Sequence, residues 1–458
     1  MLTPLQYNLH ADVLTDRGVM KAKCTVKLRN TSSKPVSCIN FLLNKGLKVT
    51  SIEVDRKSLN FVQSLRHFTD IREVKVNYIE VKLKSPIAPG SSAQITIMYQ
   101  GTIKGYDNVF RYVKDKISND YTILRLDAYS YPVLGELELR KQISTIPSQR
   151  FSYNLEIEVP KGLIVANTGK LVGVLEENNR VLYRYVSKKP SWRIDIAVSR
   201  FKVESSRKRD ITIFALEEDF EHAKRILREV ERCLQFYEAN FGPPPQWCGF
   251  TIIELPEGYG GQADMCGMLV ARESFTDPGS VGGVYHELAH LWNVPSGEEV
   301  PSRFLDEGFA SYFQLLAEKE FLGDEIFRRK ISSLRQRFLE LASKKPILLK
   351  IPVAEYGKYL VTDASYIVGT WTLYVLHKIV GDYCFKKLVR EFIIRHKNTP
   401  ATLKDFKRTA VKVCGYHISK FLDEWLFGTK AAYHLIKETP LNKIIELHEK
   451  NLNKFLRI

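Results

Sequence analysis

The sequence contains no run of eighteen apolar residues and no basic, apolar leader at its N-terminus. Because a membrane-spanning helix needs about 20 mainly apolar residues, no such helix is expected. A secretory signal combines a basic start with a short apolar stretch, and the opening residues Met1 to Tyr7 show neither feature. These absences predict a chain located in the cytoplasm.

Cysteine motifs are also missing. Seven cysteines are scattered along the 458 residues, and none of them forms a C-x-x-C pair. An odd number of cysteines without C-x-x-C spacing argues against a disulfide framework and against a cysteine zinc site. The pattern therefore favours a reducing compartment, although Cys24 and Cys38 could meet across two strands. Cys266 is interpreted as a small packing residue, because no basic partner that would activate a thiol is evident.

The chain also lacks any stretch in which basic and aromatic residues alternate as they do in a nucleic-acid groove. Its net charge is +16, but the charges are dispersed, and one of the denser basic runs, Arg207 to Arg209, is only three residues long. Nucleic acid is therefore not an expected partner. The content of hydrophobic residues, 44%, is that of a globular protein, and the length predicts two or three domains. These properties leave the oligomeric state open.

What the sequence does contain is the string HELAH, from His286 to His290. On an α-helix, residues four apart lie on one face, so two imidazoles at this spacing can reach one tetrahedral zinc ion. Glu287 projects beside that position, where a carboxylate can act as the general base that takes a proton from water. The alternative is a surface helix that happens to carry two histidines.

A catalytic zinc site needs a third protein ligand and one open position. Glu307 is the expected third ligand, because it stands at the start of a mostly apolar helical stretch, where an unpaired carboxylate is costly to bury. Between the two segments, residues 293–302 contain two prolines and a glycine and are predicted to form a loop. Glu298 and Glu299 lie in that loop and are rival ligands.

HELAHLW followed by LDEGFASYF resembles the gluzincin zinc metallopeptidases related to aminopeptidase N. The resemblance implies one zinc ion held by His286, His290 and Glu307, with Glu287 as the catalytic base. Sixteen residues, 291–306, separate the second histidine from the glutamate, two fewer than is usual in that family.

The resemblance extends to the family's substrate-binding strings. Residues 261–270, GQADMCGMLV, resemble the strand that lines the substrate groove, so Gly261, Gly267 and Met268 are expected to contact substrate. The glutamate that grips the substrate's free amine in the family falls on Asp264. Backbone groups of residues 267–269, expected on an edge strand, would pair with an extended peptide.

Residues 365–370, SYIVGT, resemble the helix start that carries the family's oxyanion-donating tyrosine, which makes Tyr366 the second catalytic candidate. The family's N-terminal amine-binding glutamine has no clear counterpart near Asp127. An alternative is that Tyr366 and Asp264 serve only in packing and turn formation.

The periodicity predicts two types of structure along the chain. Alternating apolar residues separated by turns predict an all-β N-terminal domain over residues 1–205. A strand–helix–strand pattern and then helical spacing predict an α+β, mainly helical catalytic domain over 206–430, followed by a helical tail over 431–458. The resemblance implies a saddle-like β domain and a thermolysin-like catalytic domain.

The sequence thus predicts a zinc-dependent peptidase that removes amino-terminal residues from peptides. Two alternatives remain. One is a peptidase-like scaffold that binds partners with little catalysis, and the other is a zinc endopeptidase or another hydrolase.

Overall fold

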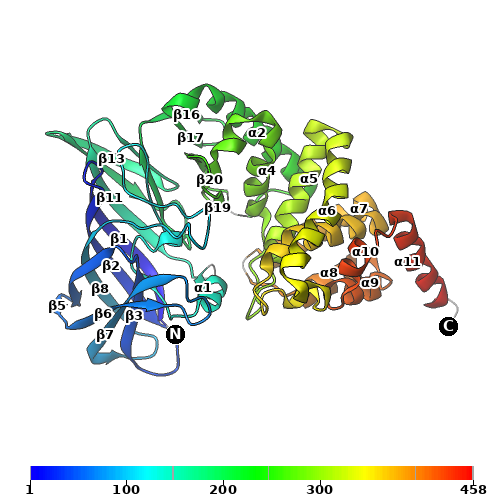
Figure 1. Ribbon diagram of the computed structural model, residues 1–458, viewed down its shortest axis with the longest axis horizontal. Coiled ribbons are helices and arrows are strands. Elements are labelled where there is room, and N and C mark those ends of the chain that lie inside the picture. The colour runs from blue at the N-terminus through cyan, green and yellow to red at the C-terminus, as the bar shows by residue number, and fades with distance from the viewer. Residues whose placement is uncertain (1, 147–148, 246, 398, 456–458) are drawn as a thin grey trace. The chain divides into compact units, whose positions relative to one another are not determined.

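The computed structural model describes residues 2–146, 149–245, 247–397 and 399–455 (Figure 1). The chain divides into two compact units, one of Met1–Arg228 with Trp247–Ser280 and one of Glu229–Gln246 with Val281–Ile458. The first contains the β-sheets and the second the long helices, so the predicted order of a β region before a helical region is confirmed. The predicted boundaries after residues 205 and 430 stay a prediction.

The first unit is built on a large sheet whose strand order is β13-β14-β11-β1-β2-β8-β4-β5. Apolar and polar residues alternate along these segments, which explains why they form strands with one buried face. In β2, the side chains of Ala22, Cys24, Val26 and Leu28 are buried and their neighbours point outward. The strands of this sheet are β1 (Leu2–Leu14), β2 (Val19–Asn30), β4 (Leu47–Val54), β5 (Lys57–Ser58), β8 (Ser92–Gly101), β11 (Ser152–Pro160), β13 (Lys170–Glu177) and β14 (Arg180–Val186).

Two smaller sheets complete the all-β part, with orders β10-β3-β7-β6 and β12-β15-β9. Their inward side chains join those of the large sheet in one hydrophobic core that runs from Tyr7 to Val198. The strands are β3 (Val36–Leu43), β6 (Phe61–His67), β7 (Lys75–Ile87), β9 (Thr122–Arg125), β10 (Val133–Leu134), β12 (Ile164–Asn167) and β15 (Asp195–Ser199), and a short helix, α1 (Leu139–Thr145), follows β10.

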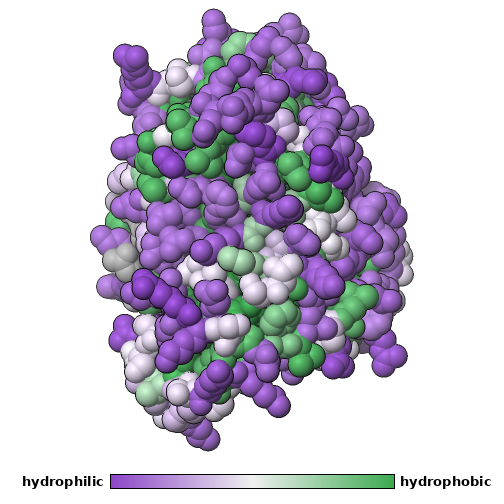
Figure 2. Space-filling view, turned by 90° about the vertical axis from the view of Figure 1, so that its left-hand side faces the viewer, coloured by the Kyte–Doolittle hydropathy of each residue, from purple (hydrophilic) through white to green (hydrophobic). Residues whose placement is uncertain are grey.

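The outer strand β13 carries the most exposed apolar side chains of the large sheet. Leu171, Val172, Val174 and Leu175 are each 45–53% exposed. A β-bulge between Leu171 and Gly173 interrupts the ladder, a device that discourages pairing of an edge with another chain. One face of the molecule is seen in Figure 2, where hydrophobic side chains form small groups within a mainly hydrophilic surface.

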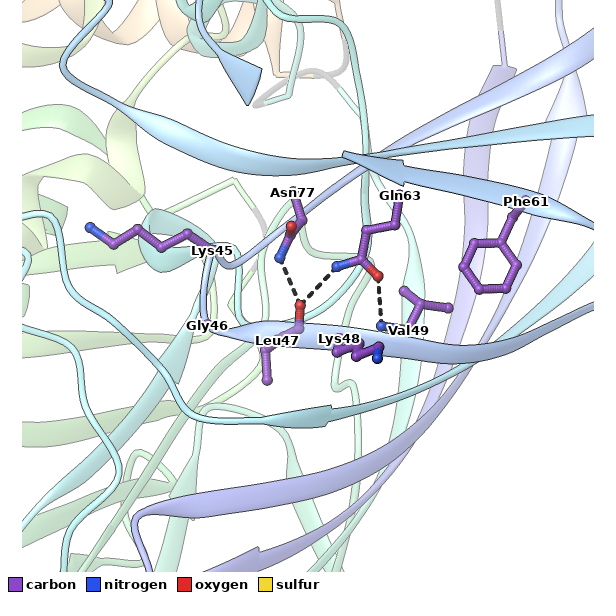
Figure 3. A pocket seen from close by; sticks show the side chains of 8 residues that line it. All are labelled: Lys45, Gly46, Leu47, Lys48, Val49, Phe61, Gln63 and Asn77. Carbon is purple, nitrogen blue, oxygen red and sulfur yellow. Dashed lines mark hydrogen bonds between the residues drawn. The ribbon is translucent and has the colours of Figure 1, made fainter. Parts of the chain in front are cut away.

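A pocket of about 490 Å³ lies beside β4, lined by Lys45, Gly46, Leu47, Lys48, Val49, Phe61, Gln63 and Asn77 (Figure 3). The Gln63 amide bridges the β4 backbone, since Val49 N donates to its Oε1 at 2.9 Å and its Nε2 donates to Leu47 O at 3.0 Å. Asn77 Nδ2 donates to the same carbonyl at 2.7 Å. Because both amides are engaged in holding the strand, we interpret the pocket as structural.

A fourth sheet has the strand order β16-β17-β18-β20-β19 and also lies within the first unit. The central strands β17 and β18 run parallel and are buried along almost their whole length, as expected for strands covered on both faces. The bounds are β16 (Phe201–Ser206), β17 (Ile211–Leu216), β18 (Phe250–Leu255), β19 (Gln262–Asp264) and β20 (Gly267–Ala271), and α3 (Arg272–Thr276) follows.

Glu254 in β18 is fully buried, and Leu216 N donates to its Oε2 at 2.7 Å. Burial, with the neighbouring Asp219 carboxyl second, raises the pKa of Glu254 to about 9. A glutamate in an unfolded chain titrates near about 4.3, so the folded state keeps a proton that the unfolded state releases. The free energy of unfolding should therefore fall as the pH rises from about 5 to about 9.

The substitution Glu254→Gln should remove that part of the pH dependence, because an amide can keep the bond to Leu216 N without titrating. We expect the variant to gain stability relative to the wild type as the pH rises. Denaturant unfolding at pH 5.5 and pH 8.5 measures this difference. An identical pH slope for the two proteins would show that Glu254 is ionised in the fold.

The helical part begins with α2 (Ala223–Phe241) and then consists, in the described residues from 281 on, of eight further α-helices. Gly381 has a φ of 78° and divides the longest of them, α7, into two helical segments. The bounds are α4 (Gly282–Ala289), α5 (Phe309–Leu322), α6 (Asp324–Lys344), α7 (Thr370–His396), α8 (Leu403–Cys414), α9 (Ile418–Leu426), α10 (Lys430–Ile436) and α11 (Leu441–Phe455). None of the helices in the described ranges is both long and apolar enough to cross a bilayer.

The cysteines correct one expectation. Cys248 pairs with Cys266 and Cys384 pairs with Cys414, with Cα atoms 6.1 and 6.0 Å apart, whereas Cys24 and Cys38 remain free. The prediction of unpaired cysteines was wrong because each pair is created by tertiary packing at separations of 18 and 30 residues, which no short motif encodes. The argument for a reducing compartment therefore loses its basis.

Candidate metal centre

The two histidines of the HELAH string lie one turn apart at the end of α4. Their rings are 4.9 Å apart between centroids and perpendicular to each other, and Glu307 faces both of them. The distance from Glu307 Oε2 is 3.0 Å to His286 Nε2 and 3.7 Å to His290 Nε2. Among the residues that the structure describes, these three form the one group whose ligand atoms come within 4.8 Å of one another in a manner suited to a metal ion.

Glu307 is presented by a π-helical turn, η6 (Phe304–Gly308), rather than by a regular α-helix. Such turns are rare and are frequently found at functional sites. Arg303, which precedes the turn, adopts a left-handed conformation with a φ of 67°. Its guanidinium binds Glu307 Oε1 and lies 3.0 Å from Asp306 Oδ2, so Glu307 is held by one oxygen while the other faces the histidines.

The protonation states of Glu307 and His290 suit a cation. Burial alone would raise the pKa of Glu307, but Arg303 and the two histidines outweigh it and hold this pKa well below the usual range. Burial lowers the pKa of His290 to about 4, so its imidazole is neutral at neutral pH. An ionised carboxylate and a neutral imidazole are the forms in which these side chains bind metals, so the donor set fits zinc.

Tyr366 lies in a second π-helical turn, η10 (Ser365–Gly369). Its ring stacks on that of His286 with 5.7 Å between centroids. Burial, followed by the charge of Glu307, raises the pKa of Tyr366, so the phenol keeps its proton and can donate it in a hydrogen bond.

The π-turns η6 and η10 approach each other closely at Gly308 and Gly369. A Cβ atom added to Gly369 would lie 2.9 Å from Gly308 Cα, so a side chain at this position would push the turns apart. The Ser365 hydroxyl donates to the carbonyl of Ser302 at 2.6 Å and adds a second link between the segments. These contacts fix the distance between the Tyr366 phenol and the Glu307 carboxylate.

Glu287 follows His286 on α4 and is half-buried. Burial opposes the charged form of His286, but the hydrogen bond and charge of Glu307, with a smaller contribution from Glu287, raise the pKa of His286. The structure thus brings together five predicted residues, namely His286, Glu287, His290, Glu307 and Tyr366. Their roles stay predictions.

The rival ligands occupy other positions. Glu298 Oε1 accepts a hydrogen bond from Leu403 N at 2.9 Å, at the N-terminus of α8, where a carboxylate compensates unpaired amide groups. In the described ranges, neither Glu298 nor Glu299 belongs to a metal-binding group with the histidines.

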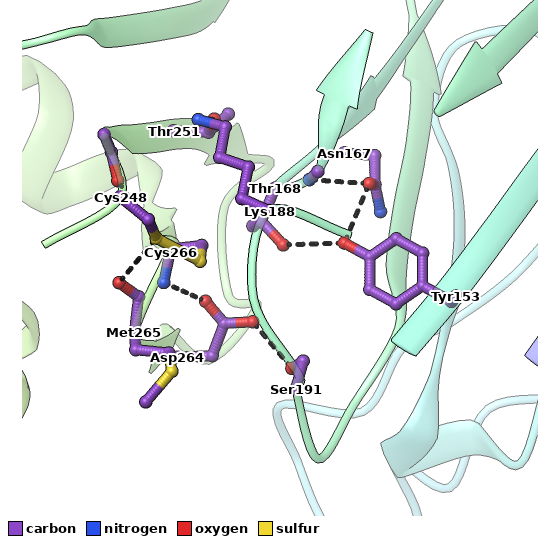
Figure 4. The surroundings of a disulfide bond; sticks show 12 residues. Tyr153, Asn167, Thr168, Lys188, Ser191, Cys248, Thr251, Asp264, Met265 and Cys266 are labelled. Atoms are coloured by element: carbon purple, nitrogen blue, oxygen red, sulfur yellow. Dashed lines mark hydrogen bonds between the residues drawn. A yellow bond between two sulfur atoms is a disulfide. The ribbon is translucent and has the colours of Figure 1, made fainter. Parts of the chain in front are cut away.

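The predicted substrate-binding residues Gly261, Asp264, Gly267 and Met268 lie in or next to β19 and β20. Both Asp264 oxygens are engaged, because Cys266 N donates to Oδ1 at 2.7 Å and Ser191 Oγ donates to Oδ2 at 2.9 Å (Figure 4). Burial raises the pKa of Asp264.

The edge strand was predicted incorrectly. β20 lies between β18 and β19, so the backbone of residues 267–269 is already paired on both sides. On this side of the sheet the edge strand is β19, Gln262–Asp264, because the chain doubles back through the turn that contains Cys266. Backbone groups free to pair with an added strand therefore belong to β19.

A buried charge network that the sequence did not reveal supports β19. Asp127 Oδ1 accepts from Gln262 Nε2 at 2.5 Å, and its Oδ2 accepts from Arg193 Nη2 at 2.7 Å. Burial opposes ionisation of Asp127, but Arg193 and Arg125 lower its pKa to about 2. Asp127 is in the region where an amine-binding residue was expected, yet no sequence signal linked it to the strand at Gln262.

Known peptidases resemble this chain in sequence. Residues 227–425 match the model of the peptidase family M1 domain. A leucyl aminopeptidase of Saccharolobus solfataricus is 23% identical over 327 residues, which are 67% of this chain and 41% of that protein. A tricorn protease-interacting factor F2 of Thermoplasma volcanium is 24% identical over 261 residues, which are 53% of this chain and 33% of that protein. The chain thus spans less than half the length of these relatives.

Among solved structures, an M1 zinc metallopeptidase variant from Deinococcus radiodurans with a bound Tyr-Ser-Ala substrate superposes with a TM-score of 0.66. Its sequence is 16% identical, and the match covers 93% of this chain and 94% of the other. A two-domain M1 zinc metallopeptidase variant bound to L-arginine gives a TM-score of 0.65 at 17% identity, with the same coverage of both chains. These matches confirm the predicted fold class.

Proposed function

We propose that the chain is a zinc-dependent aminopeptidase of the peptidase M1 family, because residues 227–425 match that family's domain and a leucyl aminopeptidase is among its relatives. The single observation that carries the proposal is the convergence of His286, His290 and Glu307 in one group, with Glu287 and Tyr366 beside it. Residues 206–430 would form the catalytic domain and hold one zinc ion. Peptides are the proposed substrates.

Zinc held by these side chains would polarise the scissile carbonyl and make water a stronger acid. Glu287 accepts the proton of the attacking water and returns it to the leaving amine. Tyr366 donates its phenolic hydrogen to the carbonyl oxygen as negative charge develops there, a contribution of about 3 kcal/mol if it equals other donors of this kind. Arg303 keeps Glu307 ionised and oriented throughout.

The β19 edge would bind the substrate backbone by strand addition, next to Gly261. Gly267 and Met268 are buried in β20 and would act by supporting β19, with which they pair. Asp264 would receive the substrate's free amine. The engagement of both Asp264 oxygens favours a second candidate, a zinc endopeptidase, which has no need of an amine-binding carboxylate.

A cytoplasmic location is part of the same proposal. It requires that the two disulfides persist inside a cell, as disulfides do in the intracellular proteins of hyperthermophilic organisms.

Hydrolysis of matched peptides with free and acetylated amino termini tests the proposal. We expect cleavage of the free peptides one residue at a time from the amino terminus, and loss of this activity on removal of metal. Cleavage of the acetylated peptides at internal bonds would support the endopeptidase instead. A zinc-loaded protein that cleaves neither set would be a scaffold, and the proposed function would be wrong.

A further inference from the structure

Asn293, three residues after the HELAH string, contacts His290 on the side of the ring away from Glu307. Its amide nitrogen lies 2.6 Å from His290 Nδ1, while His290 Nε2 faces Glu307 Oε2 at 3.7 Å. Asn293 follows the 3₁₀ turn η5 (His290–Trp292), and its backbone N–H donates to the carbonyl of His290 at 3.1 Å. The side chain is therefore anchored by its own backbone next to the ring that it touches.

Two features of this contact between Asn293 and His290 conflict with metal binding by the imidazole. A ring that offers the Nε2 lone pair to a cation must carry its proton on Nδ1, so an amide nitrogen at Nδ1 would set one donor against another. In addition, Asn293 Oδ1 is buried and has no hydrogen-bond partner among the described residues. A buried carbonyl oxygen without a partner costs about 1–3 kcal/mol.

One rotation removes the opposition of two donors and gives the buried oxygen a partner. A half-turn about the Cβ–Cγ bond exchanges the amide oxygen and nitrogen, which have nearly the same size. Oδ1 then accepts a hydrogen bond from His290 Nδ1–H, and the buried oxygen is no longer unpaired. The same bond holds the proton on Nδ1 and aims the Nε2 lone pair at Glu307.

We propose that Asn293 is a positioning residue that accepts a hydrogen bond from His290 Nδ1–H and thereby fixes the tautomer and orientation in which His290 binds zinc. Partners of this kind commonly change metal affinity by about 10–100-fold when they are removed. The inference rests on the proposed metal site, but it assigns a role to a residue that touches neither substrate nor metal.

The test compares three variants by competition for zinc with a chelator of known affinity. Asn293→Ala should weaken zinc binding by about 10–100-fold. Asn293→Asp should bind zinc at least as tightly as the wild type, because a carboxylate can only accept at Nδ1. Asn154→Ala, which removes an exposed amide on β11, should leave the affinity unchanged.

Three outcomes would overturn the inference while leaving the proposed function intact. They are unchanged zinc affinity in Asn293→Ala, equal losses in the Ala and Asp variants, and an Nε2–H tautomer of His290 in the zinc-loaded wild type. The last is read from ¹H–¹⁵N correlation spectra of the imidazole, which need no variant and so remain informative if Asn293→Ala fails to fold. Failure of the wild type to bind zinc would instead contradict the proposed function.

Discussion

Glu287→Gln should abolish most peptide hydrolysis while zinc stays bound. The substitution keeps the size of the side chain and removes its ability to accept a proton, so the loss should be that of a general base, about 10²–10⁴-fold in kcat. Binding of zinc should change little, because Glu287 is not among the three convergent ligands. Turnover of a free peptide and the metal content of the same preparation measure the two effects.

The matched control is Glu320→Gln, which neutralises an exposed glutamate on α5. This variant should match the wild type in both measurements. Unchanged turnover in Glu287→Gln would remove Glu287 from the mechanism, and simultaneous loss of zinc would show that it supports the metal site rather than proton transfer.

The second large effect is expected at the third ligand. Glu307→Gln should lower zinc affinity by more than the 10–100-fold that is typical of a supporting partner, because a charged donor is replaced by a neutral amide. Activity at limiting zinc should fall in parallel. Asp306 still pairs with Arg303, so the arginine is not left without a counter-charge.

Glu298→Gln provides the control for this prediction, since Glu298 lies in the loop between the ligands and was a rival candidate. An amide oxygen can still accept from Leu403 N, so the variant should fold and keep its zinc. Zinc loss in Glu298→Gln together with retention in Glu307→Gln would reverse the ligand assignment. Titration of both proteins with zinc under identical conditions gives the comparison.

The convergence of His286, His290 and Glu307 could be predicted from the sequence because the information for it is local. The spacing of His286 and His290 determines their common face on a helix, and the cost of burying Glu307 near an apolar stretch indicates that it needs a partner. The alternating apolar residues of the N-terminal region and the helical spacing of the C-terminal region were equally informative, as β2 and α7 show.

What the sequence could not predict depends on tertiary contacts. The link from Asp127 to Gln262 joins residues 135 apart in the chain, and the disulfide of Cys248 and Cys266 forms only where the segments before β18 and after β19 meet. The identity of the edge strand depended on a three-residue strand, Gln262–Asp264, too short to show a period. The π-turns at Glu307 and Tyr366 depend on the close approach of Gly308 and Gly369 and have no local signature.

X-ray absorption at the zinc edge of the purified protein shows whether His286, His290 and Glu307 bind zinc. We expect one zinc per chain, surrounded only by nitrogen and oxygen atoms at about 2.0–2.2 Å, with the outer-shell scattering of two imidazoles. A sulfur shell at about 2.3 Å would place the metal on cysteine, and a protein that takes up no zinc would have no metal centre at these residues.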